Sequence, residues 1–436
     1  MSKKRYTVLD AARERLATAF RDFDNVLVAF SGGKDSGVCL NLAYEFARET
    51  DQLHKLAFYY QDYEANYQHT HDYVGRVFDG FEGVERRYWL CLPHSAACAV
   101  SMHQSRWIPW NPAEKDIWVR DMPSHPTVVN IDNAPFGFEV GYSGFNTRIF
   151  FAQWFAETHG PTAVVVGIRA EESLSRQGVL TSQHRVNMHD GKRWTTTVSD
   201  EVTNFYPIID WTVEDIWTAN GRFGWDYNRL YDLYHQAGLT LHQMRVASPF
   251  HSAGQGNLKL YRVIDPNSWG KMVSRVNGAN FAAIYGGTHA MGWRNITKPP
   301  HFTWKQYAEF LMETLPADTK KRLVEHLDRL ARDWASDGYG RNPKVIAEME
   351  RLGLNIERTG VDDPRCTKPG FYEVVKILDD FPDESSVAMF RKLPSWKGVC
   401  VTILKNDFSL QSMGVSRSQK QMKARNEALQ KYKDIL

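Results

Sequence analysis

Short apolar runs alternate with segments of helical periodicity along the first part of the chain. Residues 8–23 carry apolar side chains three and four positions apart, which predicts an amphipathic helix. Residues 25–30 form a continuous apolar run, a pattern typical of a central parallel strand that is buried on both faces. The alternation then predicts strands at 54–60, 84–92 and 163–166 and helices at 36–46, 66–79 and 145–158. This order predicts an α/β fold with a doubly wound, mostly parallel sheet.

The alternation is interrupted once and is later lost. Residues 103–144 are irregular, contain several Pro and Gly, and bring together Trp107, Trp110 and Trp118. We expect a functional loop or an inserted subdomain there, because long loops without secondary structure are uncommon in compact domains. Beyond about residue 240 helical patterns dominate, at 266–277, 303–314, 317–335 and 342–352. Shorter mixed patterns follow at 372–378, 387–393 and 399–404.

These changes of pattern divide the chain into three expected parts. Residues 1–240 form an α/β domain with the irregular insertion, residues 241–361 a mainly helical domain, and residues 362–436 a small mixed segment that ends in a basic helix. Over residues 416–436 six Lys or Arg stand against two acidic residues. This end is either a solvated helix or a contact to nucleic acid, for which the three tryptophans of the insertion would offer stacking surfaces.

The composition limits the classes of function. With 436 residues, 43% of them hydrophobic and 24% charged, the chain can bury large cores and is not a disordered protein. Its formal net charge of +2 excludes bulk polyanion binding by the whole chain. Five irregularly spaced cysteines favour a reducing compartment over a disulfide framework. No apolar stretch approaches the length of a membrane span, so we expect a cytoplasmic protein, and an oligomer stays open.

The strand expected at 25–30 leads directly into a short polar loop where a helix begins. The loop reads Ser31-Gly32-Gly33-Lys34-Asp35-Ser36. Two glycines after a strand let the backbone turn tightly and point its N–H groups at an anion, and the following helix adds its positive end. Lys34 can neutralise phosphate charge, Asp35 can hold Mg²⁺ that is shared with phosphate oxygens, and the serines supply hydroxyls. The alternative is an ordinary capped turn, but all six residues in this context favour a phosphate site.

This hexapeptide resembles the signature of the PP-loop ATP pyrophosphatases, and Lys at its fourth position is typical of the phosphoadenosine phosphosulfate (PAPS) reductase branch. The resemblance implies a fold like that of the adenine nucleotide alpha hydrolases and binding of ATP, or a related adenylyl nucleotide, with Mg²⁺. Members of the superfamily cleave ATP between the α and β phosphates, whereas the reductases bind a finished sulfonucleotide.

Other segments resemble the same branch. Asp62 follows the second strand, where the family has an acidic residue at the crevice of the sheet, although it could instead cap the next helix. Residues 167–173 follow the strand at 163–166 and resemble the family's Gly-x-Arg-x-x-Glu-Ser loop, in which a guanidinium recognises phosphate or sulfate, unless the segment is only a solvated loop. The resemblance implies a nucleotide site lined, beyond the hexapeptide, by Asp62, Gly167, Arg169, Glu172, Ser173 and Arg245, with Arg176 as a weaker candidate.

Two later segments refine the resemblance. Residues 206–217 resemble the branch's Pro-Ile-x-x-Trp-x-x-x-Asp-[VI]-Trp element, and Thr212 with Asp215 has the spacing of a helix capping pair. We therefore expect a structural role for Asp215, Trp211 and Trp217. Residues 245–293 resemble a narrower subgroup, the IbrA-like or YbdN-like proteins, which carry an added domain of unknown function.

The cysteines argue against reductase chemistry. The resemblance to sulfonucleotide reductases would require a cysteine near the C-terminus in a Glu-Cys-Gly-[IL]-His setting, and this sequence has none. Cys400 lies in an apolar run and is expected to be buried and inert, whereas Cys366 has basic neighbours that could lower its pKa. No paired cysteines suit an iron–sulfur cluster. Cys91, His94, Cys98 and His103 match no standard zinc spacing, so we expect no zinc.

Three functions stay open at this point. The first is an adenylating enzyme in which Lys34, Asp35 and Arg169 are catalytic and pyrophosphate is released. Its relatives modify tRNA bases, small amides or DNA backbones (the DndC-like proteins), so nucleic acid is a natural substrate. The second is a sulfonucleotide reductase, and the third is a non-catalytic, nucleotide-gated regulator that acts with a DNA-binding partner protein.

Overall fold

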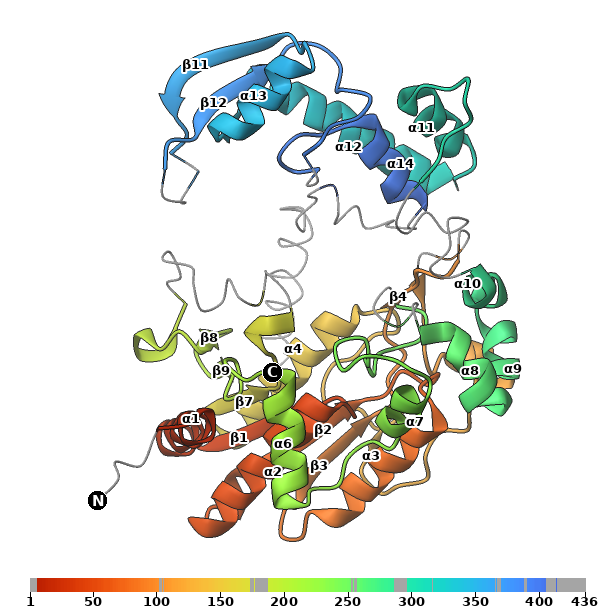
Figure 1. Cartoon of the computed structure of the whole chain (residues 1–436). Coiled ribbons are helices and arrows are strands. Elements are labelled where there is room, and N and C mark those ends of the chain that lie inside the picture. The colour runs from red at the N-terminus through yellow and green to blue at the C-terminus, as the bar shows by residue number, and fades with distance from the viewer. Residues whose placement is uncertain are drawn as a thin grey trace. The chain divides into compact units, whose positions relative to one another are not determined.

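The computed structural model describes residues 6–101, 104, 106–172, 176, 187–251, 254, 257–285, 296–315, 317–364, 366, 370–387, 390–404 and 413. The chain divides into two compact units (Figure 1). The first unit comprises residues 1–97 and 106–275, and the second comprises residues 98–105 and 276–436. None of the helices that the structure describes is long and apolar enough to cross a membrane.

A seven-stranded sheet forms the centre of the first unit. Its strands, in spatial order, are β6 (Val128–Val129), β3 (Arg86–Leu90), β2 (Leu56–Gln61), β1 (Asn25–Phe30), β7 (Thr162–Val166), β9 (Val202–Phe205) and β8 (Thr195–Thr197). Every neighbouring pair is parallel except β8 with β9. The expected doubly wound, mostly parallel sheet is therefore confirmed. The antiparallel edge made by β8 is a feature that the apolar pattern did not predict.

Helices cover both faces of this sheet (Figure 1). The helices of this unit are α1 (Val8–Asp22), α2 (Lys34–Glu49), α3 (Gln68–Gly80), α4 (Gly144–His159), α6 (Val213–Phe223), α7 (Leu230–Gln236), α8 (Leu258–Ile264) and α9 (Pro266–Arg275), with short 3-10 turns η1 (Leu53–Lys55), η2 (Pro112–Ile117), η3 (Ala170–Glu172) and η4 (His189–Gly191). Phe58 packs on Phe78 of α3, whereas its neighbour Tyr59 packs on Phe151 of α4. Since consecutive strand residues point to opposite faces, α3 and α4 lie on opposite sides of the sheet.

The strand order creates a switch point at the centre of the sheet. From β1 the chain continues outward through β2 and β3, and it later returns to the other side of β1 as β7. Ala29 of β1 pairs with Val166 of β7, so the loops that follow these two strands leave the sheet side by side. Open α/β sheets bind ligands in the crevice at such a point. The fold thus brings the hexapeptide after β1 next to the Gly167–Arg169 segment after β7.

The irregular segment is largely packed into the first unit. It contains β5 (Arg106–Trp107), which pairs with β4 (Ala96–Ala97), together with η2 and β6. Trp107 and Trp110 are buried, with 3% and 1% of their surface exposed. These two rings belong to the core, which corrects the expectation that they offer a stacking surface, because a base needs an accessible ring face.

The second unit is mainly helical with a small sheet. Its helices are α10 (Ala279–Tyr285), α11 (Trp304–Glu313), α12 (Ala317–Ser336), α13 (Pro343–Arg351) and α14 (Trp396–Leu404), and its antiparallel strands are β10 (Tyr339–Arg341), β12 (Glu373–Ile377) and β11 (Ile356–Asp362). The helices expected at 303–314, 317–335 and 342–352 are confirmed. The basic segment at 416–436 lies outside the described residues.

Candidate functional site

The hexapeptide of residues 31–36, which we name the phosphate loop after the function expected of it, connects β1 to α2 through two glycines. Gly32 has a φ of +73°, and a Cβ added there would meet Thr70 Cγ2 at 3.0 Å. Both the backbone conformation and the packing therefore favour glycine. Gly33 is the N-cap of α2 and supplies no side-chain hydrogen bond to the first turn. The loop backbone is thus close-packed on one side, while the positive end of a 16-residue helix begins at Lys34.

The two serines close the loop on itself. Ser31 N donates to Ser36 Oγ at 3.0 Å, and the two hydroxyl oxygens are 2.9 Å apart. Ser36 Oγ also donates to the carbonyl oxygen of Gly33 at 3.1 Å. Since the hydroxyl hydrogen of Ser36 is donated to Gly33, the hydroxyl of Ser31 is the donor in the contact between the two serines.

A charged network occupies the start of α2. Lys34 Nζ donates to Asp35 Oδ2 at 2.9 Å, and Arg169 Nε donates to Asp35 Oδ1 at 2.6 Å. Arg169 and Lys34 are buried, with 3% and 7% of their surface exposed. Asp35 therefore holds two desolvated cations in place, an arrangement that leaves their charges poorly screened toward any anion that enters.

More charged groups surround this network. Arg169 also pairs with Glu171, and its Nη2 lies 3.7 Å from Glu172 Oε1, while Glu172 pairs with Arg176. Burial lowers the pKa of Arg176, Asp35 raises it, and the nearby charges of Arg245 and Arg169 lower it. The exposed Arg245 is therefore within electrostatic range of the network. Among the described residues, four cations therefore lie near three carboxylates here: Lys34, Arg169, Arg176 and Arg245 near Asp35, Glu171 and Glu172. Ser173, the remaining predicted residue of this loop, lies outside the described residues.

Gly167 lets the loop after β7 touch the phosphate loop. A Cβ on Gly167 would lie 2.9 Å from both the carbonyl carbon of Asp35 and the backbone nitrogen of Ser36. Real side chains do not approach backbone atoms this closely, so only glycine fits without displacing the loop. This contact fixes where Arg169, two residues later, meets Asp35.

Asp62 points into the protein. It is 2% exposed, Trp89 Nε1 donates to its Oδ2 at 2.8 Å, and the backbone N–H of Glu64 donates to its Oδ1 at 2.7 Å. It does not cap α3. The backbone N–H of Gln68, the first residue of α3, instead donates to Asp265 Oδ2 at 2.8 Å. Asp62 thus holds the turn that follows β2.

The predicted structural residues of the 206–217 segment have structural contacts. Thr212 and Asp215 form both hydrogen bonds of a capping box at the start of α6. Trp211 is buried and donates through Nε1 to the carbonyl oxygen of Val8 at 3.1 Å. Trp217 packs edge-on against Tyr231, with ring centroids 5.2 Å apart.

Two residues that the sequence did not single out support the phosphate loop. Asn228 is fully buried, and its Nδ2 donates to the carbonyl oxygen of Gly32 at 3.0 Å and to Thr70 Oγ1 at 2.9 Å. Tyr231 accepts a hydrogen bond from Lys34 N at 3.1 Å, and Lys34 Nζ lies 5.5 Å from the centre of its ring. No sequence spacing connects either residue with a loop almost 200 positions away.

The described cysteines are mostly buried and unreactive. Burial raises the pKa of Cys400 to about 12 and also raises the pKa of Cys39, Cys91 and Cys98. A thiol with such a pKa is protonated at neutral pH and is a poor nucleophile. The expectation that Cys400 is buried is confirmed.

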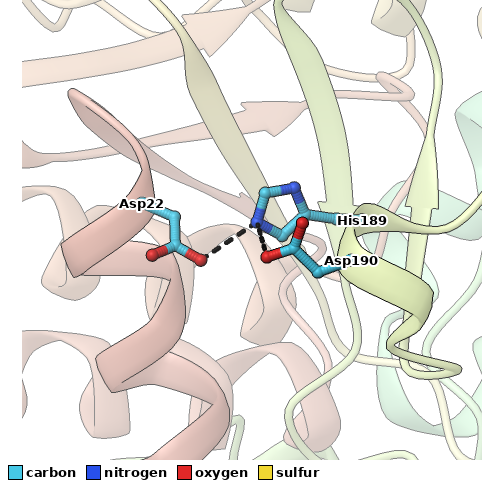
Figure 2. A group of neighbouring side chains, drawn as sticks. All are labelled: Asp22, His189 and Asp190. Atoms are coloured by element: carbon cyan, nitrogen blue, oxygen red, sulfur yellow. Dashed lines mark hydrogen bonds and ion pairs between the residues drawn. The ribbon is translucent and has the colours of Figure 1, made fainter.

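A separate polar cluster joins α1 to η4. His189 Nε2 lies 3.0 Å from Asp22 Oδ2 and 3.7 Å from Asp190 Oδ2 (Figure 2). Arg21 donates to both oxygens of Asp22, at 2.7 and 3.2 Å, and Lys192 donates to Asp190 at 3.0 Å. Arg21 and Lys192 already pair with its carboxylates, so the cluster is a network of ion pairs between α1 and η4. Within the described part of the chain, Cys91, His94 and Cys98 do not form a metal-sized group, and His103 lies outside it.

Comparison with known proteins connects these residues with a family. Residues 152–254, which include Gly167, Arg169 and Arg245, match the model of the phosphoadenosine phosphosulfate reductase domain. Residues 238–424 match the domain of unknown function DUF3440. The uncharacterized protein YbdN of Escherichia coli (strain K12) is 31% identical over 414 residues, which cover 94% of this chain and 90% of that protein.

The solved structures that resemble this chain do so with low TM-scores and low sequence identity. The phosphoadenylyl-sulfate (PAPS) reductase of Candida auris in a phosphate complex has a TM-score of 0.27 and 15% identity, and covers 51% of this chain and 84% of its own. The NH3-dependent NAD synthetase of Campylobacter jejuni has a TM-score of 0.27 and 11% identity, and covers 67% of this chain and 100% of its own. The fold assignment rests instead on the strand order of the chain itself.

The identity and coverage shared with YbdN extend across both compact units, and the two family models follow one another along the chain. The phosphate loop and the Gly167–Arg169 segment meet at the switch point of a mostly parallel sheet. The chain therefore belongs to the YbdN-like family of PP-loop proteins, in which a PAPS reductase-like domain is combined with a C-terminal domain of unknown function.

Proposed function

We propose that this protein binds ATP with Mg²⁺ at the phosphate loop, cleaves it between the α and β phosphates, and transfers the adenylyl group to an acceptor substrate. The observation that carries the proposal is the network in which Asp35 holds the buried cations Lys34 and Arg169 at the start of α2. Pre-positioned cations in a desolvated site stabilise charge that develops on a leaving group.

Each part of the site has a role in this reaction. The backbone of Gly32 and Gly33 and the hydroxyl of Ser31 hold the β and γ phosphates, and Lys34 and Arg169 neutralise them. An oxygen of the acceptor attacks the α phosphorus, and the bond from that phosphorus to the bridging oxygen breaks. The electron pair leaves with pyrophosphate, and the acceptor oxygen carries the adenylyl group.

Mg²⁺ would be held by Asp35 together with phosphate oxygens, because this ion usually binds through one or two carboxylates plus its nucleotide. It would supply charge neutralisation on the departing pyrophosphate. Both oxygens of Asp35 already accept hydrogen bonds from cations, which disfavours binding of Mg²⁺ before the nucleotide arrives.

We expect Mg²⁺ alone to leave the melting temperature unchanged. ATP with Mg²⁺, at about 100 times its dissociation constant, should stabilise the protein by about 2.7 kcal/mol.

The direct test is incubation with α-labelled ATP and Mg²⁺, followed by separation of the products. The proposal requires AMP or an adenylate, with pyrophosphate, and Lys34→Ala should abolish their formation. ADP with phosphate would contradict it.

Replacing Cys366 and Cys400 together with Ser should leave the ATP-cleaving activity intact. Loss of that activity in a folded protein would favour the reductase alternative.

Nucleic acid is the acceptor class that we propose first. The feature that favours it is the basic segment at 416–436, with six Lys or Arg against two acidic residues. A chain truncated after Val415 should keep its response to ATP but lose salt-sensitive binding of DNA or RNA. Identical binding curves for the two chains across a salt series would remove this part of the proposal. A protein that acts only as a non-catalytic regulator would bind ATP but would form neither AMP nor an adenylate.

A further inference from the structure

A second polar cluster lies one strand away from the phosphate loop. It is formed by Gln61 at the end of β2, Tyr63 two residues later, His94 after β3, and Gly144 and Arg148 at the start of α4. Tyr60 pairs with Phe30, so Gln61 is level with Ser31, the first residue of the phosphate loop. Neighbouring strands lie about 4.8 Å apart, so the backbone of Gln61 lies beside the first residue of the loop proposed to bind ATP.

The groups of the cluster converge on Gly144. A Cβ built there would lie 2.9 Å from His94 Cδ2, 3.2 Å from Gln61 Nε2 and 3.3 Å from the hydroxyl of Tyr63. Arg148 Nη1 donates to Gln61 Oε1 at 2.9 Å and lies 3.4 Å from the same hydroxyl. The rings of Tyr63 and His94 meet edge to face, with centroids 4.7 Å apart.

The backbone around the cluster is rigidly connected. Ser95 N donates to the carbonyl oxygen of Tyr142 at 2.7 Å, and Gly141 N donates to that of Pro93 at 2.9 Å. Ser143 caps α4 by accepting from Asn146 N at 3.1 Å. The loop that carries His94 is therefore fixed to the start of the helix that carries Arg148.

Two buried atoms of opposite type have no partner among the described residues: Gln61 Nε2 and His94 Nε2. Gln61 Oε1 accepts from Arg148, so the other end of the amide is the N–H donor. His94 Nδ1 lies 2.9 Å from the carbonyl oxygen of Leu92 and must donate to it, so Nε2 carries the lone pair. Burial, with Arg148 and Arg106 nearby, lowers the pKa of His94 to about 3 and keeps the ring neutral.

Leaving such atoms unsatisfied is costly, at about 1–3 kcal/mol for each group. A carboxylate or a phosphodiester could accept from Gln61 but has no hydrogen to give to His94. An ammonium could donate to His94 but would be repelled by Arg148. A neutral group that presents an N–H or O–H donor beside an acceptor satisfies both atoms. The half-buried Tyr63 and Arg148 lie next to them, Arg148 against Gln61 and Tyr63 against His94.

We propose that Gln61 and His94 form a subsite for a neutral donor–acceptor group, an amide edge or a hydroxyl, of the substrate that receives the adenylyl group. This inference rests on the proposed function for its place in the reaction. It adds the class of chemical group that the adenylyl-accepting substrate presents. Gln61 Nε2 donates a hydrogen bond to the oxygen or nitrogen acceptor of that group, and the N–H or O–H of the same group donates to His94 Nε2.

The test follows the Nε2 nitrogen of His94 in full-length protein labelled with [15N]histidine, in the presence of a non-hydrolysable ATP analogue and Mg²⁺. Loss of one signal in His94→Asn assigns it. Acetamide, ethylene glycol and acetate are titrated separately. We expect a saturable shift with acetamide or with ethylene glycol, and the responding probe distinguishes an amide from a hydroxyl. Acetate should give none.

Gln61→Glu is the decisive variant, because it keeps the size and a partner for Arg148 but removes the donor. It should weaken the response of His94 to the neutral probe about tenfold or more. Gln306→Glu makes the same chemical change in the second unit and should change nothing. The proposal is overturned if acetate acts as strongly as the neutral probes, if Gln61→Glu has no effect, or if no probe moves the signal, which would mean a bound water only.

The outcome is separable from that of the proposed function. If the ATP analogue fails to raise the melting temperature of the same sample, the nucleotide site is wrong. The His94 signal still reports whether the subsite binds its probes.

Discussion

At the scale of single residues, the contact between Gly167 and the phosphate loop is the most sensitive to a small change. Gly167→Ala places a methyl group 2.9 Å from backbone atoms of Asp35 and Ser36, and backbone cannot yield as a side chain can. We expect a loss of about 1–3 kcal/mol of stability and of the thermal response to ATP with Mg²⁺. Urea unfolding and melting curves measure the two effects.

Gly221→Ala is the matched control, since Gly221 is exposed in α6 and its added Cβ would meet nothing within 4 Å. Alanine at a helical glycine should stabilise the protein by about 1 kcal/mol. A Gly167→Ala protein that kept the full response to ATP would show that the loop tolerates displacement.

His94 provides a residue-scale prediction about pH. Burial lowers its pKa from 6.5 to about 3, so between these values the unfolded chain binds a proton that the folded protein excludes. Stability should therefore fall as the pH falls below about 6.5, by up to about 1.4 kcal/mol per pH unit from this group. The charged and titratable groups that face the ring are Arg148, Arg106 and Tyr63, and the two arginines reinforce the effect.

The measurement is the free energy of unfolding in urea at pH 7 and at pH 5. His94→Asn should lose about 2 kcal/mol less than the wild-type protein between the two values. His54→Asn, at an exposed position, should keep the wild-type dependence. Equal losses for all three proteins would contradict a neutral, buried His94.

Single residues also mark the limit of sequence reasoning about the site. The hexapeptide was visible because its six residues are contiguous, and Arg169 because it follows a strand in a known pattern. Glu64 was not visible: it is fully buried at a φ of +62°, and its partners are the backbone N–H groups of Trp110 and Val119, at 2.7 and 3.0 Å. Contacts between positions so far apart leave no periodic trace in a single sequence.

At the scale of elements, the helices α8 and α9 are joined to the α/β unit by buried polar contacts. Arg275 of α9 donates to Glu64 at 2.8 and 3.2 Å, and their side chains are 2% and 0% exposed. Removing one partner of a buried pair leaves an uncompensated charge. We expect Arg275→Met to cost about 3–5 kcal/mol in urea unfolding.

The pair Arg76–Asp226 is a suitable control because both side chains are exposed, at 46% and 44%. Exposed pairs contribute about 0–1 kcal/mol, so Arg76→Met should be nearly neutral. A double variant, Glu64→Gln with Arg275→Met, should recover part of the loss. If Arg275→Met were as mild as Arg76→Met, the backbone N–H groups of Trp110 and Val119 would be sufficient partners for the buried Glu64.

The elements that the sequence predicted are those with strong apolar patterns. The continuous run of β1 and the helical spacing of α1, α3 and α4 lie within a residue or two of the predicted bounds. The edge strand β8 was missed because it consists of three threonines, and β11 because most of its residues are exposed. Backbone pairing with a neighbouring strand defines these strands, and pairing has no signal in local hydrophobicity.

At the scale of the whole molecule, the compact unit and the family models divide the chain differently. The domain of unknown function begins at residue 238, close to the boundary expected at 240, but the first compact unit continues to residue 275. The ring of Tyr261 stacks on Tyr67 with centroids 3.4 Å apart, and Asp265 accepts from Gln68 N at 2.8 Å. Residues 241–275 thus complete the α/β unit, although they belong to the next family model.

Truncation tests this division. A fragment of residues 1–240 lacks α8 and α9, so it loses the contacts of Tyr67 and Gln68 and leaves Glu64 buried without Arg275. The lost ion pair alone costs about 3–5 kcal/mol, a large share of the 5–15 kcal/mol that is typical of a folded domain. We expect this fragment to show no cooperative unfolding transition in urea by circular dichroism.

A fragment of residues 1–285 should unfold cooperatively. It retains α8, α9 and α10, as well as the hydrogen bond from Asn277 N to Gln104 Oε1 at 2.9 Å. Because it also contains the phosphate loop and Arg245, its melting temperature should rise with ATP and Mg²⁺. The prediction is contradicted if the 1–240 fragment unfolds with the same midpoint as the 1–285 fragment, because the α/β unit would then be complete without the helices that follow residue 240.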